Sequence, residues 1–382
     1  MKRIAILGST GSIGANTLDV VSKLKGAFRV AALSADSNSG LLAAQAQAFR
    51  PEIVSIGNGL LASQIRKLVP AGTKVLSGAE GLREIVASRN VDMVVFAISG
   101  AACLVPLLEA IRHKKAIALA NKEALVSAGT LVMKLAKANG VRILPVDSEH
   151  SAIFQCLNGR PQGLSRIYLT GTGGPLLDVS AKKFDSLPPS FILKHPKWNM
   201  GKKISVDSAT MMNKGLEIIE AQHLFGLDER HIEVLIHPEA IIHSMVEFSD
   251  GAVLAQMAVP DMRLPIQYAL TYPGRAQTPV KRVDFTKLAS LTFRPPDVKK
   301  FPCLGLARQA ARAGGTLPAV LCASDEEAVK CYLGGNVKFS GIPKMIEKVL
   351  GRHRNKRLGV SVGDILDADA WAREEMRSLC YH

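Results

Sequence analysis

The chain has 382 residues, too many for one ordinary hydrophobic core, and its 47% apolar and 21% charged residues are typical of a globular protein. This length predicts two or three domains. No run reaches the ~18 apolar residues of a membrane helix, so we expect no membrane partner. A strand pattern begins at Arg3 without a signal or transit segment, which predicts a cytoplasmic protein. The net charge of +15 permits a nucleic-acid partner, but only 5% of the residues are aromatic and the basic residues are dispersed, so phosphate-bearing small molecules explain it equally well and no nucleic acid is predicted.

The N-terminal turn has the pattern of a dinucleotide site. An apolar strand over residues 4–7 leads into Gly8-Ser9-Thr10-Gly11-Ser12-Ile13-Gly14, and a helix pattern follows. Glycines let the backbone approach a pyrophosphate, and the helix N-terminus offers free N–H groups. The spacing is G-x-x-G-x-x-G rather than G-x-G-x-x-G, so a tight turn without a ligand stays the alternative.

The end of the second predicted strand, over residues 28–33, is where such a domain selects between NAD and NADP. An acidic residue there binds the ribose hydroxyls, whereas basic or small polar residues admit a 2′-phosphate. This chain has Asp36-Ser37-Asn38, which is ambiguous. Ser37 and Asn38 suit a phosphate, and Asp36 opposes one if its side chain points inward.

Helices and short apolar strands then alternate as far as Pro145. This alternation predicts a parallel sheet covered on both faces, with ligands at the carboxyl ends of its strands. Three polar segments lie at such ends: the glycine turn, residues 120–123 and residues 147–150. Lys122 is therefore a candidate partner for a substrate oxygen, with an ordinary surface lysine as the alternative.

Asp147 and Glu149 form an acidic pair behind the last of these strands. Two residues apart in extended chain, both carboxylates point the same way. Two unit charges ~4 Å apart repel by roughly 4 kcal/mol at an effective dielectric near 20. The pair therefore predicts a divalent cation, a shared proton or, more plainly, a solvated acidic turn.

Beyond His150 the chain offers groups that suit a phosphate. The turn Thr170-Gly171-Thr172-Gly173-Gly174-Pro175 is typical of an anion nest, although a plain loop has the same composition. Ser208, Asn213 and Lys214 supply hydroxyl, amide and ammonium donors. Glu217, which we expect to begin a helix, is a candidate third carboxylate, and Glu220 one turn on competes with it.

Residues 194–202 predict a mobile lid, because a Trp and a Met lie in a loop bounded by Pro and Gly; a surface loop with a packed Trp is the alternative.

The rest of the chain predicts a second sheet, a linker and a set of helices. Residues 231–236, 240–248 and 252–259 alternate like antiparallel strands, whose sheet faces either a dimer partner or its own core. Residues 273–297 are typical of a linker. Helices are predicted over residues 304–313, 324–333, 343–350 and 364–379, and a capping box at Ser324 marks the start of the second one.

The six cysteines contain no C-x-x-C pair, which disfavours a zinc cluster. We expect them to be reduced and mostly buried thiols.

These motifs together resemble the 1-deoxy-D-xylulose 5-phosphate reductoisomerase family, over essentially the whole chain. The most specific are P-V-D-S-E-H at residues 145–150 and S-V-D-S-A-T-M-M-N-K-G-L-E at residues 205–217. The resemblance implies an α/β protein: a Rossmann-like NADPH-binding domain over residues 1–147, an α+β catalytic domain with a mostly antiparallel sheet over 148–272, the linker, and a helical bundle over 298–382. It also implies a V-shaped homodimer.

The family's reaction belongs to the methylerythritol phosphate route to isoprenoids. Deoxyxylulose phosphate rearranges by retroaldol cleavage and re-addition to an aldehyde, which hydride from NADPH reduces to methylerythritol phosphate. The resemblance implies Mg²⁺ or Mn²⁺, with Co²⁺ as a further option. A metal-free dehydrogenase of another phosphorylated hydroxyketone or semialdehyde is the alternative function.

The resemblance also implies the function of individual residues. The metal ligands and catalytic carboxylates are Asp147, Glu149 and Glu217. Lys122, also catalytic, and Ser148 contact the substrate's oxygens. The phosphate end is held by Thr172, His195, Ser208, Asn213 and Lys214. The NADPH site is lined by Thr10, Gly11, Ser12, Ile13, Ser37, Asn38, Asn121, Glu123 and Gly201, and the lid carries Trp198 and Met200.

Two positions depart from the family pattern. Thr172 stands where Ser is usual, which keeps the hydroxyl. Asp36-Ser37-Asn38 stands where many members have Gly-Lys-Asn, and the missing lysine weakens the case for strict NADPH preference.

Overall fold

The computed structural model describes residues 1–158, 162–198 and 200–381. By their contacts these residues divide into two compact units, and each is made of separate stretches of chain. Unit 1 comprises residues 1–121, 132–151 and 261–280, and unit 2 comprises residues 122–131, 152–260 and 281–382. The domain boundaries predicted near residues 147, 272 and 297 stay a prediction.

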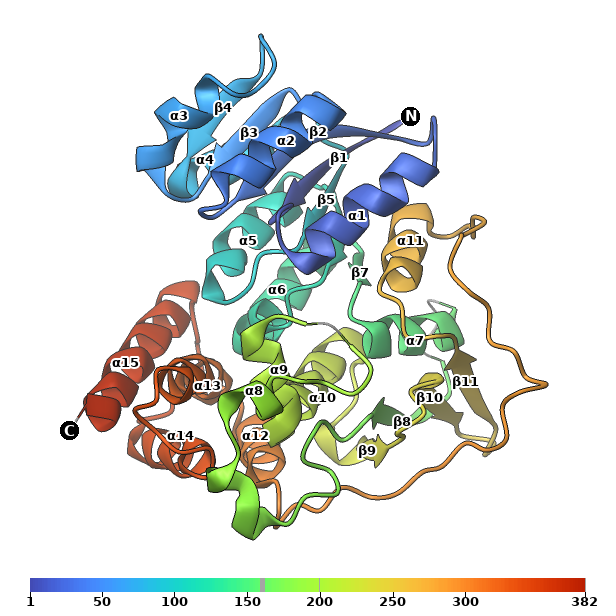
Figure 1. The fold of residues 1–382 in the computed structure, drawn as a ribbon, viewed down its shortest axis with the longest axis vertical. Coiled ribbons are helices and arrows are strands. Elements are labelled where there is room, and N and C mark those ends of the chain that lie inside the picture. The colour runs from blue at the N-terminus through green and yellow to red at the C-terminus, as the bar shows by residue number, and fades with distance from the viewer. Residues whose placement is uncertain (159–161, 199, 382) are drawn as a thin grey trace. The chain divides into compact units, whose positions relative to one another are not determined.

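Unit 1 is built on the predicted parallel sheet, which has seven strands in the order β4-β3-β2-β1-β5-β6-β7 (Figure 1). The strands are β1 (Lys2–Leu7), β2 (Phe28–Ala35), β3 (Ile53–Ile56), β4 (Lys74–Ser77), β5 (Met93–Phe96), β6 (Ala116–Leu119) and β7 (Ile143–Pro145). The chain winds outward from β1 on one side and then returns to continue from β5 on the other. The carboxyl ends of β1 and β5 therefore flank the point where the winding reverses, which is where such sheets bind ligands.

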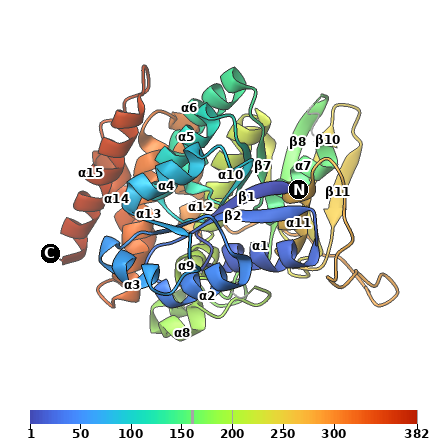
Figure 2. The ribbon, with the colours of Figure 1, turned by 90° about the horizontal axis from the view of Figure 1, so that it is seen from above.

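Helices cover both faces of this sheet, as its continuous apolar strands require. Figure 2 shows α1 and α2 on one side of β1 and β2, with α4 and α5 on the other. The helices assigned wholly to unit 1 are α1 (Ser12–Lys23), α2 (Ser39–Phe49), α3 (Ala62–Arg66), α4 (Gly78–Ala87), α5 (Leu104–Arg112) and α11 (Arg263–Thr271), with 3₁₀ turns η1 (Gly59–Leu61) and η2 (Ala101–Cys103). Two of the divisions between the units fall inside helices, namely α6 (Glu123–Asn139) and α7 (Ser148–Leu157).

Helix α11 joins unit 1 from far along the chain. It packs on α1, β6 and β7, and Arg263 Nη1 lies 3.3 Å from Asp19 Oδ2 in α1. The stretch Asp261–Val280 thus belongs by contact to the N-terminal sheet.

Unit 2 contains a four-stranded sheet in the order β11-β10-β8-β9. Its strands are β8 (Leu164–Gly171), β9 (Ile232–Ile236), β10 (Ile242–Phe248) and β11 (Val253–Met257). Strand β8 pairs parallel with β9 and antiparallel with β10, and β10 pairs antiparallel with β11. The predicted sheet, mostly antiparallel, is confirmed.

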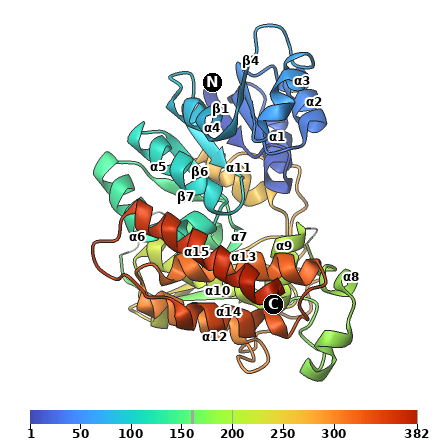
Figure 3. The same ribbon diagram turned by 90° about the vertical axis from the view of Figure 1, so that its left-hand side faces the viewer.

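The helices of unit 2 pack on this sheet and on one another. Its remaining elements are η3 (Ala181–Ser186), α8 (Pro189–Ile192), α9 (Lys202–Thr210), α10 (Met212–Phe225), η4 (Glu229–His231), α12 (Pro302–Ala313), α13 (Leu317–Leu333), α14 (Gly341–Arg352) and α15 (Val362–Tyr381). One continuous apolar core joins α10, the sheet and α12–α15. Figure 3 shows α13, α14 and α15 side by side, which confirms a helical C-terminal region.

The predicted helix start at Ser324 is wrong. Ser324 lies in the middle of α13, and both Ser324 and Asp325 are fully buried. Helix α13 is apolar on most sides, and its packing against α12, α14 and α15 outweighs the local preference of Ser and Asp for a cap.

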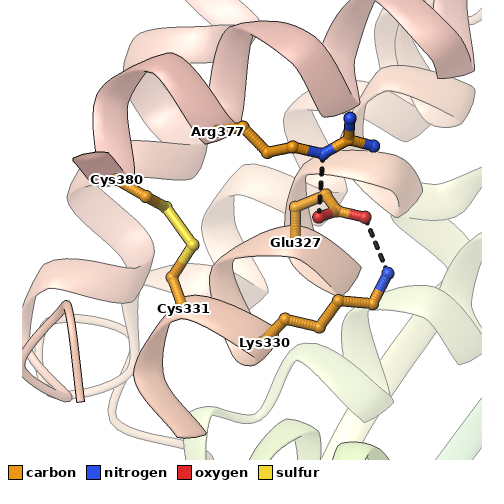
Figure 4. Close-up of a disulfide and its surroundings, with 5 residues drawn as sticks. All are labelled: Glu327, Lys330, Cys331, Arg377 and Cys380. Atoms are coloured by element: carbon orange, nitrogen blue, oxygen red, sulfur yellow. Dashed lines mark hydrogen bonds and ion pairs between the residues drawn. A yellow bond between two sulfur atoms is a disulfide. The ribbon is translucent and has the colours of Figure 1, made fainter. Parts of the chain in front are cut away.

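The cysteine prediction is partly wrong. Cys303 and Cys322 are buried thiols, as predicted, and Cys156 is a half-buried thiol. Cys331 and Cys380, however, form a disulfide between α13 and α15 (Figure 4). Spacing along the chain carried no sign of this pair, because the two positions meet only through helix packing.

Among the described helices, none combines the length and the apolar composition that a bilayer crossing requires.

Candidate active site

The glycine turn of unit 1 is shaped for an anion. Gly8 adopts φ +88°, a conformation that side chains disfavour, and a Cβ on Gly14 would lie 2.3 Å from Gly8 O. Gly11 is the N-cap of α1 and provides no side-chain cap for the first helical turn. Because the first N–H groups of a helix have no partner within the helix, they remain available to a pyrophosphate beside exposed Gly11 and Ser12. The turn therefore fits a dinucleotide.

The segment after β2 shows where Asp36 goes. Its carboxylate packs against Gly57 of the next loop, since a Cβ on Gly57 would lie 2.5 Å from Asp36 Oδ1. Asn38 Oδ1 accepts the Leu41 N–H at 3.1 Å and so caps α2. Ser37 is exposed. The predicted contacts of Ser37 and Asn38 with the cofactor stay a prediction.

Asn121 lies at the end of β6 and is 3% exposed. Its side-chain amide donates to Ile98 O at 3.0 Å and to Gly100 O at 3.1 Å. These bonds tie the end of β6 to the loop after β5, at the edge of the sheet that holds the glycine turn.

The acidic pair follows β7, but not in extended chain. Helix α7 begins at Ser148, and the Ser151 N–H donates to Asp147 O at 2.8 Å. The expectation of a strand-like pair is therefore wrong: Asp147 precedes the helix and Glu149 lies in its first turn. Ser148 donates its hydroxyl to the Glu149 carboxylate. All three side chains remain partly exposed.

In unit 2, Glu217 lies in a buried cluster of donors. Its side chain is fully buried, although it lies in the second turn of α10 rather than at a helix start as predicted. Lys122 Nζ lies 3.2 Å from Glu217 Oε1 and 2.7 Å from Asn213 Oδ1. Asn213 Nδ2 donates to Oε1 at 2.5 Å, and Lys214 Nζ lies 2.6 Å from Oε2.

The burial of the Glu217 carboxylate requires positive charge beside it. A fully buried carboxylate is stable only when positive charge or donors surround it. Two ammonium groups supply that charge here, and a hard divalent cation with carboxylate ligands supplies it equally well. Glu217 therefore fits its predicted function as a metal ligand. Glu220 is also buried, at 1% exposure, and stays the competing choice.

The residues predicted to hold the phosphate meet around the turn after β8. Lys214 packs against Gly171, because a Cβ there would lie 2.7 Å from Lys214 Cε. Thr172 Oγ1 lies 3.0 Å from His195 Nε2. A Cβ on Gly174 would lie 2.7 Å from Ser208 O, so the turn also packs on the end of α9. Thr172, His195, Ser208 and Lys214 are thus neighbours of one short glycine-rich turn.

The protonation of His195 follows from its contacts. Its Nδ1 accepts the N–H groups of Lys197 at 3.2 Å and Trp198 at 3.0 Å. Burial, assisted by the charge of Lys214, lowers the pKa of His195 to about 4. The ring is therefore neutral at pH 7, with its proton on Nε2, and is a donor toward Thr172 or an anion.

The predicted lid shares these contacts. Trp198 is half-buried and its ring lies 6.3 Å from that of His243. Gly201 is the N-cap of α9, and its carbonyl accepts both the N–H and the hydroxyl of Ser205. Met200 is half-buried, and Asn199, also within the predicted lid, lies outside the described residues. Lid motion stays a prediction.

A second buried charge cluster, which was not predicted from the sequence, lies in unit 2. Lys203 Nζ lies 2.6 Å from Asp207 Oδ2 in α9 and 2.7 Å from Asp325 Oδ2 in α13, and both carboxylates are almost fully buried. Burial and the charge of Asp325 raise the pKa of Asp207 well above its usual range. Glu123, predicted for the NADPH site, adds its charge to this cluster. The i,i+4 spacing of Lys203 and Asp207 was the only sign in the sequence.

Comparison with known proteins gives a consistent result. Family models of 1-deoxy-D-xylulose 5-phosphate reductoisomerase match residues 4–129, and models of its C-terminal domains match residues 143–225 and 257–375. A protein named 1-deoxy-D-xylulose 5-phosphate reductoisomerase from Acetivibrio thermocellus is 51% identical over 99% of both chains. One of the same name from a Synechococcus strain is 50% identical over 99% of this chain and 97% of its own.

Solved structures agree over the full length. A crystal structure of DOX-P reductoisomerase in complex with NADPH, fosmidomycin and magnesium superimposes with a TM-score of 0.94 at 41% identity, covering 100% of this chain and 98% of that one. The Zymomonas mobilis 1-deoxy-D-xylulose 5-phosphate reductoisomerase in complex with NADPH gives 0.92 at 40% identity, covering 100% and 99%. This chain belongs to the 1-deoxy-D-xylulose 5-phosphate reductoisomerase family.

Proposed function

We propose that this chain converts 1-deoxy-D-xylulose 5-phosphate to 2-C-methyl-D-erythritol 4-phosphate, using NADPH and a divalent cation. The observation that carries the proposal is the buried Glu217 cluster, with Lys122, Asn213 and Lys214 beside the glycine-rich turn of Thr172. It provides a cation ligand and a phosphate-binding turn in one unit, within a chain that matches the family over its length.

In this proposal Asp147, Glu149 and Glu217 hold Mg²⁺ or Mn²⁺. When bound, the cation stabilises charge on the substrate's oxygens during the rearrangement, and NADPH supplies the hydride. Lys122 and Ser148 donate to the substrate's oxygens. Lys122 and Lys214 both contact Glu217 in the structure, and either ammonium would be within the same cluster to donate to the substrate.

The phosphate end is held by neutral and charged donors together. The hydroxyls of Thr172 and Ser208, the Nε2–H of His195 and the side chain of Lys214 lie around the turn. The amide of Asn213, which contacts Lys122 and Glu217, is the further donor in this proposal. Binding remote from the reacting carbons anchors the substrate for both steps. Since His195 Nδ1 accepts from Lys197 and Trp198, phosphate binding at Nε2 also orients the start of the lid, which excludes water from the reaction.

NADPH is the preferred cofactor in this proposal. The Ser12 and Ile13 N–H groups receive the pyrophosphate, since the Gly11 N–H donates to Gly8 O. Asp36 packs on Gly57, and Ser37 remains exposed for the 2′-phosphate. The cytoplasm is the proposed compartment.

The direct test follows NADPH oxidation with 1-deoxy-D-xylulose 5-phosphate, with Mg²⁺, with excess chelator, and with NADH in place of NADPH. We expect turnover with NADPH and Mg²⁺, its loss on chelation and its recovery when Mg²⁺ is restored. Turnover that survives chelation would instead support a metal-free dehydrogenase. Equal kcat/KM for NADH would show that Asp36-Ser37-Asn38 does not select the 2′-phosphate.

We also propose a homodimer that buries the edge strand β11. Val253 and Leu254 on this strand are each 49% exposed, and an apolar sheet edge is a template for pairing with a second copy. Light scattering on the purified protein should give twice the chain mass, and Leu254→Lys should shift it toward the monomer. The matched change Lys281→Leu, at an exposed position outside the sheet, should leave the dimer intact. A monomeric wild-type protein contradicts this assembly.

A further inference from the structure

The disulfide in the C-terminal helices joins two unequal sulfurs. Cys331 lies near the end of α13 and is 3% exposed, whereas Cys380 lies in the last turn of α15 and is half-buried. The bond closes a segment of 49 residues that contains α14 and most of α15. Neither cysteine belongs to the residues proposed to bind substrate, cofactor or metal.

Two basic residues lie close in sequence to the bonded cysteines, and both pair with one carboxylate. Figure 4 shows Lys330, next to Cys331, and Arg377, one turn before Cys380, both reaching Glu327. Lys330 Nζ lies 2.7 Å and Arg377 Nε 3.4 Å from the Glu327 carboxylate, and both basic side chains are more than half exposed.

Helix α15 does not depend on the disulfide for its position. Arg373 pairs with Glu326 at 2.8 Å and with Glu327 at 3.1 Å, both in α13. Ala372 and Met376 are fully buried in the core. Opening the bond therefore releases only the last turn of α15, which follows Met376, and the rest of the helix stays packed on the core.

We propose that Cys331–Cys380 is a thiol-exchange site for low-molecular-weight thiols and disulfides, with Cys380 as the sulfur that is attacked. Exchange requires a thiolate to approach one sulfur in line with the S–S bond, so the more accessible sulfur reacts. The half-buried Cys380 meets that requirement and the buried Cys331 does not.

The exchange is balanced in two steps. A small thiolate attacks Cys380 Sγ, the protein S–S bond breaks, and its electron pair leaves on Cys331 Sγ, which then takes up a proton. A second small thiolate attacks the outer sulfur of the mixed disulfide, and the electron pair leaves on Cys380 Sγ, which takes up a proton. The protein disulfide is thereby reduced to two thiols, and two small thiols are oxidised to one small disulfide. The reverse sequence forms the bond, with the small disulfide as oxidant.

The test uses the full-length wild-type protein, Cys331→Ser, Cys380→Ser and the double variant, each reduced and then exposed to oxidised glutathione. Peptide mass mapping follows each cysteine, so that reaction at the half-buried Cys156 is counted separately. In the wild type we expect an intramolecular bond between residues 331 and 380 and no lasting adduct. Cys331→Ser should accumulate one glutathione at Cys380, whereas Cys380→Ser should leave Cys331 unmodified.

Thermal unfolding provides an independent measurement. Reducing the wild type should lower its Tm by roughly 3–8 °C, as expected for opening a loop of this size in a chain of this length. The double variant should show no change with reductant, and its turnover should equal that of the wild type. Failure of the pair to form, or modification of Cys331 as fast as Cys380, would overturn the proposal; neither result bears on the proposed reaction.

Discussion

Replacing Glu217 by glutamine is expected to lower kcat/KM about 10²- to 10³-fold, which corresponds to losing roughly 3–4 kcal/mol of transition-state stabilisation by the cation. Glutamine keeps the shape of the side chain but removes the charge that balances Lys122 and Lys214. Its amide nitrogen also donates where a cation needs an acceptor. The measurement is kcat/KM as a function of Mg²⁺ concentration, and the variant should lose most of its response to the metal.

Glu220→Gln is the matched control for this experiment. Glu220 lies on the same helix, α10, and is also almost completely buried, at 1% exposure. Its substitution makes the same chemical change in a similar environment, and we expect it to leave the Mg²⁺ dependence intact. If Glu220→Gln removed that dependence and Glu217→Gln kept it, the third ligand would be Glu220. Thermal unfolding of both variants separates a lost ligand from a lost fold.

Replacing Lys203 by methionine is expected to destabilise the protein by about 3–5 kcal/mol, the usual cost of removing one partner from a buried ion pair. The ammonium lies between Asp207 and Asp325, and without it two buried carboxylates face each other uncompensated. The side chain of Lys203 is 29% exposed, so water softens the loss and the lower end of the range is expected. Urea unfolding monitored by circular dichroism measures the change.

Two further variants make this prediction specific. Lys202→Met changes the exposed neighbour and should alter stability by less than about 0.5 kcal/mol. Adding Asp325→Asn to Lys203→Met removes one of the two buried carboxylates that have lost their ammonium partner. The double variant should therefore recover part of the lost free energy of unfolding. A Lys203→Met protein as stable as Lys202→Met, or a double variant less stable than the single one, would contradict the structural function assigned to the cluster.

The cluster also bears on the substrate site. Helix α9 carries Lys203 and Asp207 in its body and Ser208 in its last turn, against the Gly174 turn. Asp325 of α13 thus holds the helix that presents one of the proposed phosphate donors.

Much of the fold was predictable because local patterns carry it. The strand, glycine turn and helix at the N-terminus, the seven parallel strands and the strands β9 to β11 all follow from periodicity and turn residues. The end of α12 at Gly314 was equally clear, because glycine accepts the backbone conformation that stops a helix. The parallel sheet also predicted which segments lie at strand ends, and so which residues are candidates for the site.

Local patterns failed where packing between distant segments competes with them. Ser324 and Asp325 have the preferences of a helix start, yet the core around α13 carries the helix straight through them. Asp147 and Glu149 were expected in extended chain, but Ser148 starts a helix at once.

The sequence by itself determined the family, the parallel sheet and the residue types of a metal, phosphate and nucleotide site, because motifs and periodicity are properties of neighbouring residues. Only the tertiary structure decided which side chains pair with one another. Lys122 meets Glu217 across 95 residues, Lys203 bridges α9 and α13, and Cys331 meets Cys380 between two helices. Burial makes these contacts strong, since a charge withdrawn from water must find its partner within the fold, and no spacing along the chain specifies that partner.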